Sequence, residues 1–311
     1  MIVTVTLNPA IDKTYVLPRF EAGMLHRPQE MLSMPGGKGI NVARVARTLG
    51  ANVAATGFVA GYNGHYIANE CAKQGISPSF CETDGESRIC MTFLDQSSGA
   101  VTEVLEAGPV ISQRAYDRFV VLLRQLASKA RFVIFSGSLP PGLPVDVYRE
   151  LLTEVRAAGA APVLDTSGAA LLSALSARPF LIKPNQPEAE ALLGYRLDDF
   201  AAKRQAISDL LDMGAERVLL SLGEKGALFG DGTKLYQLPV LSLPRLVNPV
   251  GCGDSLLAGI ITGLLRGDEW PDAARLGMAS AAANALSLGA GSIRPEDVEA
   301  FLAQAVCAVL E

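Results

Sequence analysis

The chain has 311 residues, of which 49% are apolar and 19% charged, a composition that supplies a large core and excludes an intrinsically disordered chain. Its 27 Lys and Arg against 32 Asp and Glu leave a net charge of −5. No basic tract is interleaved with aromatic residues, so nucleic acid is not expected as a partner. The longest apolar run, around 256–265, is too short to span a bilayer, so no membrane is expected either.

The N-terminus and the cysteines indicate a protein of the cytoplasm. The first residues lack the basic n-region of a signal peptide and are interrupted at once by Asn8 and Pro9. The five cysteines are odd in number and lack metal-type spacing, which predicts reduced thiols. With only His26 and His65 in the chain, a His-based zinc site is not expected.

Residues 2–7 are predicted to form a buried strand that ends at the Asn-Pro turn. Asp12 then lies just past the end of a strand, where open α/β sheets bind their ligands. An aspartate that only completes a turn would give the same pattern. Residues 52–59 are predicted to form the next such strand and 64–75 a helix.

A glycine-rich loop, Pro35-Gly36-Gly37-Lys38-Gly39, precedes a helix over 40–49 with apolar residues at 42, 45, 46 and 49 on one face. Three glycines around a lysine at a helix N-terminus predict a loop that binds an anion or a polar ligand. The order matches neither Walker A nor G-x-G-x-x-G, so a Rossmann cofactor site is not supported. A tight turn with an exposed lysine remains the alternative.

Two segments, 13–34 and 87–105, alternate in character and do not fit an αβ layer. The turn at Gln96–Gly99 predicts a hairpin in the second segment. Strands outside the main sheet must cover something with their apolar face, either the ligand site as a lid or a second subunit. Arg88 on such a lid would suit a ligand phosphate, although an exposed surface arginine would look the same.

From residue 112 onward helices and strands alternate, which predicts a mostly parallel sheet with helices on both faces. Helices are expected over 112–129, 144–158, 168–176, 186–193 and 200–213, and strands over 131–136, 161–165, 180–183 and 216–221. The loops that leave these four strands carry Ser, Asp, Asn or Lys. Parallel strands end at one edge of a sheet, so these side chains are predicted to converge there.

The last part of the chain contains a hairpin over 227–238, a turn at Gly251-Cys252-Gly253-Asp254, an apolar helix and an Ala-rich helix over 270–288. The glycines of the turn let the backbone approach a ligand, and the helix start favours an anion such as phosphate. Asp254 could take a proton from a hydroxyl that attacks this phosphate. It could instead cap its helix.

Two stretches together carry a family resemblance, Gly36-Gly37-Lys38-Gly39-Ile40-Asn41-Val42-Ala43 and Gly251-Cys252-Gly253-Asp254-Ser255. The chain resembles sugar kinases of the ribokinase (PfkB) family over its whole length, and within it the 1-phosphofructokinase and tagatose-6-phosphate kinase group. The resemblance implies a single kinase domain over 1–311. Its fold would be α/β, a Rossmann-like αβα sandwich with a small β lid built from about 13–34 and 87–105.

The resemblance also implies a reaction, the ATP-dependent phosphorylation of a ketohexose phosphate. Asp254 would be the base, and Gly251, Cys252 and Gly253 would donate N–H groups to the transferred phosphoryl group. Cys252 replaces the alanine usual in the family, and the site needs only a small residue there. The acceptor would contact Asp12, Gly36, Gly37, Lys38, Asn41 and Ser138, with Arg88 and Arg27 on its phosphate.

The nucleotide and metal residues are implied in the same way. Those on the nucleotide side would be Lys183, Asn185, Ser221, Gly223, Gly226 and Asn284. Asn185 and Glu188 resemble an Asn-x-x-Glu element that handles Mg²⁺ through water. ATP and Mg²⁺ are therefore the expected cofactors, with K⁺ as an optional addition.

Fructose 1-phosphate is the expected acceptor, because the stretch Gly36–Arg47 resembles that group more, and its product would be fructose 1,6-bisphosphate. Tagatose 6-phosphate, giving tagatose 1,6-bisphosphate, is the alternative indicated by Asn248–Gly251. A non-catalytic sugar-phosphate-binding protein on the same fold is a third reading, disfavoured by the presence of both Asp254 and the glycine turn. A homodimer through the lid is expected, since open strand edges pair readily.

Overall fold

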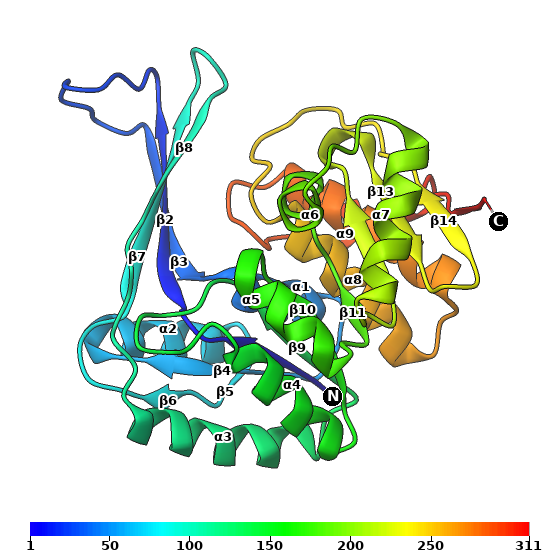
Figure 1. Ribbon diagram of the computed structural model, residues 1–311. Coiled ribbons are helices and arrows are strands. Elements are labelled where there is room, and N and C mark those ends of the chain that lie inside the picture. The colour runs from blue at the N-terminus through cyan, green and yellow to red at the C-terminus, as the bar shows by residue number, and fades with distance from the viewer. Residues whose placement is uncertain (311) are drawn as a thin grey trace.

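The computed structural model describes residues 1–310, and its centre is a mostly parallel β-sheet (Figure 1). Within these residues the sheet has 11 strands in the order β15-β14-β13-β12-β11-β10-β9-β1-β4-β5, with β6 paired to β4. The parallel strands are β1 (Ile2–Thr6), β4 (Val53–Val59), β5 (Ser77–Pro78), β6 (Cys81–Glu82), β9 (Phe132–Ser136), β10 (Ala161–Asp165), β11 (Leu181–Ile182) and β12 (Val218–Ser221). Antiparallel strands β13 (Ala227–Gly230), β14 (Leu235–Leu238) and β15 (Ala308–Val309) extend one edge.

Helices cover both faces of this sheet, which confirms the predicted three-layer α/β fold. One layer contains α1 (Lys38–Thr48), α2 (Gly61–Lys73), α8 (Cys252–Arg266), α9 (Trp270–Ala285) and α10 (Pro295–Leu302). The other contains α3 (Gln113–Ala127), α4 (Val147–Ala157), α5 (Gly168–Ala174), α6 (Gln186–Leu193) and α7 (Phe200–Asp212). Strand β1 serves both layers because successive side chains of a strand point to opposite faces, Ile2 to the first layer and Val3 and Val5 to the second.

Side-chain caps begin several of these helices. The Ser112 hydroxyl accepts a hydrogen bond from Ala115 N at the start of α3, and the Asp199 carboxylate accepts one from Ala202 N at the start of α7. Each such cap stabilises its helix by about 1 kcal/mol. The helix starts of α1 and α8 differ, because neither has a side-chain cap and both follow a glycine with positive φ.

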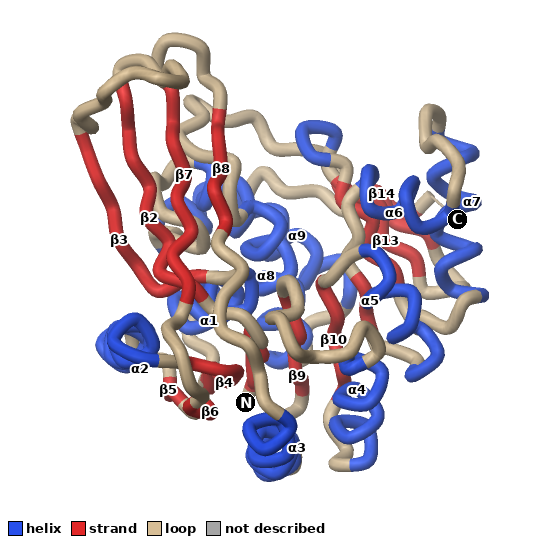
Figure 2. Tube along the Cα trace, turned by 60° about the vertical axis from the view of Figure 1, so that its left-hand side comes forward, coloured by secondary structure: helices blue, strands red, loops and turns tan. Residues whose placement is uncertain are grey.

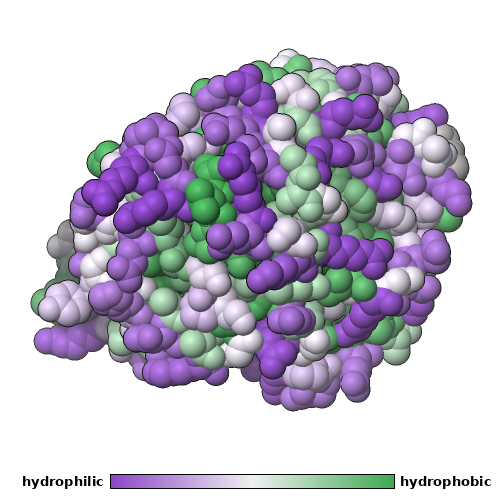
Figure 3. Space-filling model, turned by 90° about the horizontal axis from the view of Figure 1, so that it is seen from below, coloured by the Kyte–Doolittle hydropathy of each residue, from purple (hydrophilic) through white to green (hydrophobic). Residues whose placement is uncertain are grey.

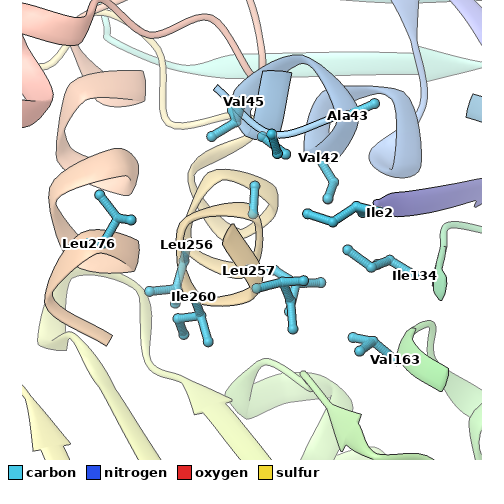
Figure 4. Packing of buried hydrophobic residues seen from close by; sticks show 14 of the residues in the cluster. Ile2, Val42, Ala43, Val45, Ile134, Val163, Leu256, Leu257, Ile260 and Leu276 are labelled. Carbon is cyan, nitrogen blue, oxygen red and sulfur yellow. The ribbon is translucent and has the colours of Figure 1, made fainter. Parts of the chain in front are cut away.

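Helix α1 is buried on all sides from Gly39 to Ala46, whereas the sequence predicted a single apolar face. The reason is that α8 packs beside α1 on the same face of the sheet, so that both the sheet and α8 cover α1 (Figure 4). Helices α8 and α9 in turn approach closely at Gly259 and Gly277, where a Cβ would collide with the facing backbone. The polar residues of α1 that face α8 are therefore enclosed in the core.

A second sheet of four strands stands beside the core in the order β3-β2-β7-β8 (Figure 2). Its strands are β2 (Ala10–Leu17), β3 (Glu30–Gly36), β7 (Arg88–Asp95) and β8 (Val101–Leu105). The two outer pairs are antiparallel and the central pair, β2 with β7, is parallel. The expected hairpin is thus present, and it joins the strands of the first segment in one sheet.

The sequence missed three features of the fold. Helix α10 and the two-residue strand β15 were not predicted, and β11 is shorter than the expected strand over 180–183. Short elements at the end of a chain carry little periodicity of their own. Helix α10 forms because Val298 and Phe301 pack onto the first helix layer.

Seen from below, the surface is mostly hydrophilic, with hydrophobic areas interspersed among polar residues (Figure 3). This is the expected exterior of a molecule whose apolar side chains are enclosed between layers. Within residues 1–310, none of the helices combines the length and the apolar character needed to cross a membrane.

Candidate active site

A cavity of about 790 Å³ lies between the carboxyl ends of the parallel strands and the inner face of the second sheet. The strand ends and their exits contribute Thr6, Gly137, Ser138, Thr166, Lys183 and Ser221. The second sheet contributes Asp12, Thr14, Arg88, Cys90, Thr92 and Glu103. The polar strand exits therefore converge as their order along the chain predicted.

The start of α8 forms one wall of this cavity. Gly251 is the residue before the helix and has φ 86°, a conformation that costs little only in glycine. A Cβ at this position would also lie 2.7 Å from Gly291 N. Cys252 N donates to Pro249 O over 3.3 Å, whereas within residues 1–310 Gly251 N and Gly253 N donate to no protein acceptor. These two N–H groups, with the positive end of the helix, can hold an anion.

Asp254 lies in the first turn of α8 and does not cap it. Its side chain is buried, with 6% of the residue exposed, and Oδ2 accepts a hydrogen bond from Asn41 Nδ2 over 2.9 Å. Burial and the neighbouring Asp165 raise the pKa of Asp254 to about 6, opposed by Lys38, Asn41 and Lys183. A carboxylate with such a pKa is suited to accept a proton near neutral pH.

Two lysines surround Asp165, a fully buried carboxylate at the end of β10. Lys183 Nζ lies 3.2 Å and Lys38 Nζ 3.7 Å from Asp165 Oδ1. Lys38 Nζ is also 3.9 Å from Glu188 Oε1. Asp165, more than the other acids nearby, raises the pKa of Lys38 despite its burial, so Lys38 remains cationic beside the cavity. The sequence pointed to Asp165 only as part of a strand exit and did not assign it a role.

Asp12 is the second carboxylate with a raised pKa. It lies inside β2 rather than in the loop before it, and Oδ2 accepts a hydrogen bond from Gly37 N over 3.3 Å. Burial raises the pKa of Asp12 to about 6, against the opposing effects of Gly37 N–H, Arg44 and Arg88. Gly36 faces the same side chain, and a Cβ there would overlap the Asp12 carboxylate. Gly36 thus makes room for Asp12 and does not itself line the cavity.

Arg88 reaches the cavity from the first residue of β7. Its Nε donates to Asn8 O and its Nη1 donates to Glu106 O, each over 3.1 Å. None of the hydrogen bonds within residues 1–310 uses Nη2, which leaves this group for a ligand. Arg27 lies elsewhere, exposed in the connection between β2 and β3, and it does not line the cavity.

Asn185 and Glu188 are engaged with each other. Asn185 Oδ1 accepts from Glu188 N over 2.8 Å and Glu188 Oε2 accepts from Asn185 N over 2.9 Å, which is a capping box at the start of α6. The helix cap alone therefore accounts for the Asn-x-x-Glu spacing, without a metal. Asn185 lines the cavity, and Glu188 Oε1 remains directed at Lys38.

Asn284 is fully buried and does not line the cavity. Its Nδ2 donates to Val250 O over 2.9 Å and its Oδ1 accepts from Gly291 N over 2.7 Å. The side chain thus holds the turn before α8 against the loop after α9. This geometry differs from the direct nucleotide contact expected from the sequence, because its amide has no exposed group left for a ligand.

Fifteen of the residues singled out in the sequence line the cavity together: Asp12, Gly37, Lys38, Asn41, Arg88, Ser138, Lys183, Asn185, Ser221, Gly223, Gly226, Gly251, Cys252, Gly253 and Asp254. The cavity also has an apolar wall that was not predicted from the sequence, formed by Val240, Leu241, Leu243, Leu246, Met278, Ala281, Ala282 and Ala285. These residues come from the segment before α8 and from α9, and only packing brings them to one place.

A buried carboxylate beside free N–H groups, with two lysines close by, is what transfer of a phosphoryl group to a hydroxyl requires. Fold and site together define an α/β phosphotransferase with an alcohol group as acceptor. The model of the pfkB family carbohydrate kinases matches residues 5–297. The chain belongs to this family, whose members use ATP, and the expectation of a carbohydrate kinase is confirmed.

Similar proteins agree with this assignment. The chain is 33% identical over 307 residues to the tagatose-6-phosphate kinase of Staphylococcus epidermidis, with 98% of both chains covered. Phosphofructokinase-2 from Escherichia coli, solved with potassium, is similar with a TM-score of 0.89 and 27% identity over 97% of this chain and 98% of that one. Ribokinase from Arabidopsis thaliana, solved with ribose and ATP, has a TM-score of 0.76 at 20% identity over 97% and 98% of the two chains, which confirms the ribokinase-like fold.

The raised pKa of Asp254 predicts a stability effect that depends on pH. Below its unfolded pKa near 3.8 this carboxyl is protonated in both states and costs the folded protein nothing. As pH rises through about 6, the folded protein must ionise it in a buried place, so the free energy of unfolding falls. Asp254→Asn removes the buried charge and should stabilise the ligand-free protein by on the order of 3 kcal/mol at pH 8, and by about half as much at pH 5. Urea denaturation at both pH values measures the difference.

Asp84→Asn, on an exposed turn, is the matched control and should change stability little at either pH. An Asp254→Asn effect of the same size at pH 5 and pH 8 would contradict the raised pKa.

Proposed function

We propose that this carbohydrate kinase phosphorylates a ketohexose phosphate, with fructose 1-phosphate as the first candidate and tagatose 6-phosphate as the second. One observation carries the proposal: a single cavity holds a buried carboxylate beside free N–H groups and an arginine with an unused Nη2. The carboxylate would activate a hydroxyl of the acceptor, and the arginine would bind a phosphate that the acceptor already carries.

Asp254 is the proposed general base. Its Oδ2 is held by Asn41, which leaves Oδ1 to accept the proton of the acceptor hydroxyl. The hydroxyl oxygen then attacks the terminal phosphorus of ATP in line with the leaving oxygen. Gly251 N–H and Gly253 N–H stabilise the negative charge on the transferred group, whereas Cys252 N–H is partly engaged with Pro249 O.

Arg88 is proposed to hold the phosphate already on the sugar, and Asp12, Gly37, Lys38, Asn41 and Ser138 to contact the sugar. Fructose 1-phosphate and tagatose 6-phosphate suit this arrangement equally, because each carries a phosphate at one end and a primary hydroxyl at the other. Both give a hexose 1,6-bisphosphate. The relative from Staphylococcus epidermidis, named for tagatose 6-phosphate, supports the second candidate.

ATP is proposed to bind along Lys183, Asn185, Ser221, Gly223 and Gly226. The apolar wall beside them offers a surface for the flat face of a base, since such side chains stack on aromatic rings without a polar partner. Lys183, held near Asp165, would meet the phosphates as a point charge. Asn284 would contribute to nucleotide binding without touching the nucleotide, because its hydrogen bonds to Val250 and Gly291 hold the turn before α8 in place.

The residues present fit a Mg²⁺ ion bound with the nucleotide. Both carboxylate oxygens of Asp165 are buried without a hydrogen bond, and Lys38 Nζ lies within 4 Å of this carboxylate and of Glu188. Two carboxylates that already converge on one cation match the ligands Mg²⁺ takes together with phosphates and water. Mg²⁺ would neutralise charge on the phosphates there. K⁺, present in the E. coli phosphofructokinase-2 structure, is proposed as an optional additional cofactor.

The whole chain is proposed to act as one kinase domain, with the four-stranded sheet as a lid that excludes water from the cavity. The lid has apolar side chains on its surface, among them Met31, Val104 and Leu105, and open edges at β3 and β8. A homodimer through the lid would cover them. The five free cysteines agree with a cytoplasmic location.

The proposed function predicts that ADP release with ATP and Mg²⁺ is most efficient when the acceptor carries both a phosphate and a free primary hydroxyl, and much slower with an unphosphorylated sugar. Fructose 1-phosphate, tagatose 6-phosphate, fructose 6-phosphate, fructose and ribose form the panel, and NMR of the product identifies the new phosphate ester. Fructose 1-phosphate should have the highest kcat/KM. ADP release with none of the acceptors, despite a thermal shift with a sugar phosphate, would favour a non-catalytic binding protein.

Asp254→Asn should lower kcat by roughly 10²-fold or more, the loss expected when a general base is removed. The amide keeps the size of the side chain but cannot accept the proton, so ATP binding should persist. Steady-state ADP release and ATP titration measure the two quantities. Full activity in this variant would exclude Asp254 as the base.

Arg88→Ala should raise KM for the phosphorylated acceptor about tenfold or more and leave the use of the unphosphorylated sugar nearly unchanged. Lys13→Ala is the matched control, because Lys13 follows Asp12 in β2 and strand alternation directs it to the opposite face of the lid. If KM for the sugar phosphate stayed the same in Arg88→Ala, Arg88 would not be the phosphate anchor.

A further inference from the structure

Arg44 is a buried cation beneath the cavity. It projects from α1, its residue is 7% exposed, and burial lowers the pKa of its guanidinium. An arginine nevertheless stays charged in a protein. Burying a charge is costly unless hydrogen bonds and neighbouring charges compensate. The acceptors of its hydrogen bonds show which groups this buried charge holds in place.

Arg44 is held mainly by neutral acceptors. Nε donates to Gln74 Oε1 over 2.9 Å, Nη1 donates to Ala290 O over 2.7 Å and to Asn41 Oδ1 over 3.1 Å, and Nη2 donates to Pro35 O. Within residues 1–310 no carboxylate forms an ion pair with it. Cys71 lies nearby but stays neutral, because burial raises the pKa of its thiol to about 12. The guanidinium therefore fixes the positions of four acceptors and is not simply neutralised.

The contact with Asn41 has a chemical consequence. A guanidinium has only donors, so the amide atom that faces Arg44 must be the oxygen. The Asn41 amide nitrogen is thereby directed to the other side, where it donates to Asp254 Oδ2 over 2.9 Å. Without Arg44 the amide could turn over and place its oxygen against the carboxylate. Arg44 thus decides whether Asn41 donates to Asp254.

The other two contacts hold the backbone on either side of this pair. Pro35 is the first residue of the glycine-rich loop that contains Lys38, and Ala290 precedes Gly291, which packs against Gly251 and Asn41. The loop that contains Gly291 is also tied to the turn before α8, through the side chain of Asn284. One buried cation therefore joins the glycine loop, α1 and the loop behind the anion-binding turn.

We propose that Arg44 is a positioning residue for phosphoryl transfer: by fixing the Asn41 amide it keeps Asp254 ionised and directed at the acceptor hydroxyl. The proposal rests on the proposed role of Asp254 as the base. Arg44 contacts neither substrate, since it does not line the cavity. Its effect should therefore be on kcat and on the pH dependence of the reaction, and much less on KM for ATP.

The test compares Arg44→Met and Arg44→Lys with Arg47→Met, an exposed arginine on the same helix. Arg44→Met should lower kcat about tenfold or more, move the acid limb of kcat/KM to higher pH and leave KM for ATP within about twofold. Arg44→Lys keeps the charge without the planar fork, so it should shift the profile in the same direction. It also provides a folded variant if Arg44→Met does not fold. Arg47→Met should behave as the wild type.

Asp12 also faces Arg44, so a loss of charge alone could alter the profile through Asp12. A double-mutant cycle separates the two routes. If Arg44 acts through Asn41, then Arg44→Met should change kcat by less than about twofold in an Asn41→Ala background. Fully additive losses would overturn the proposal, as would a wild-type profile in Arg44→Lys. If Asp254→Asn retains full activity and the acid limb of its kcat/KM profile is unchanged, the assignment of Asp254 as the base and the proposed role of Arg44 are both wrong.

Discussion

The site depends on a carboxylate that is buried yet able to ionise. Burial and Asp165 favour the protonated form of Asp254, while the Asn41 amide and two lysines favour the charged form. Each unit of pKa shift corresponds to about 1.4 kcal/mol, so this balance decides whether a base is present at neutral pH. The balance exists only where α1 packs across the start of α8, because Asn41 and Asp254 belong to these two helices. Packing of this helix pair is thus a chemical requirement as well as a structural one.

The path of the chain connects the two sheets at the cavity. Strand β1 of the core is followed by β2 of the lid after only three residues, and a single residue, Gly37, separates the end of β3 from the start of α1. Asp12 and the glycine loop therefore lie where lid and core meet. A displacement of the lid would move Asp12 relative to Asp254, which lies in the core. This connectivity lets the second sheet contribute Asp12 directly to the cavity.

Many polar residues around the cavity hold other residues and leave few groups free. Asn185 and Glu188 cap α6, and Asn284 ties the anion-binding turn to the loop at Gly291. Among the groups left for ligands are Asp254 Oδ1, the N–H groups of Gly251 and Gly253, and Arg88 Nη2. Preorganisation of this kind lowers the cost of ordering the site when substrates bind. In the Asn-x-x-Glu element, the spacing of Asn185 and Glu188 serves a capping box at the start of α6.

The sequence by itself determined the class of fold, the order of most helices and strands, the two glycine motifs and the convergence of polar strand exits, because periodicity and turn chemistry are local. It left open whether Asp254 caps its helix, and it predicted one apolar face for α1. Only the tertiary structure decided that Asn41 bonds Asp254 across 213 positions of the chain, that Arg44 is buried beneath them and that an apolar wall completes the cavity. Such contacts depend on how two packed layers align, and no local pattern encodes the alignment.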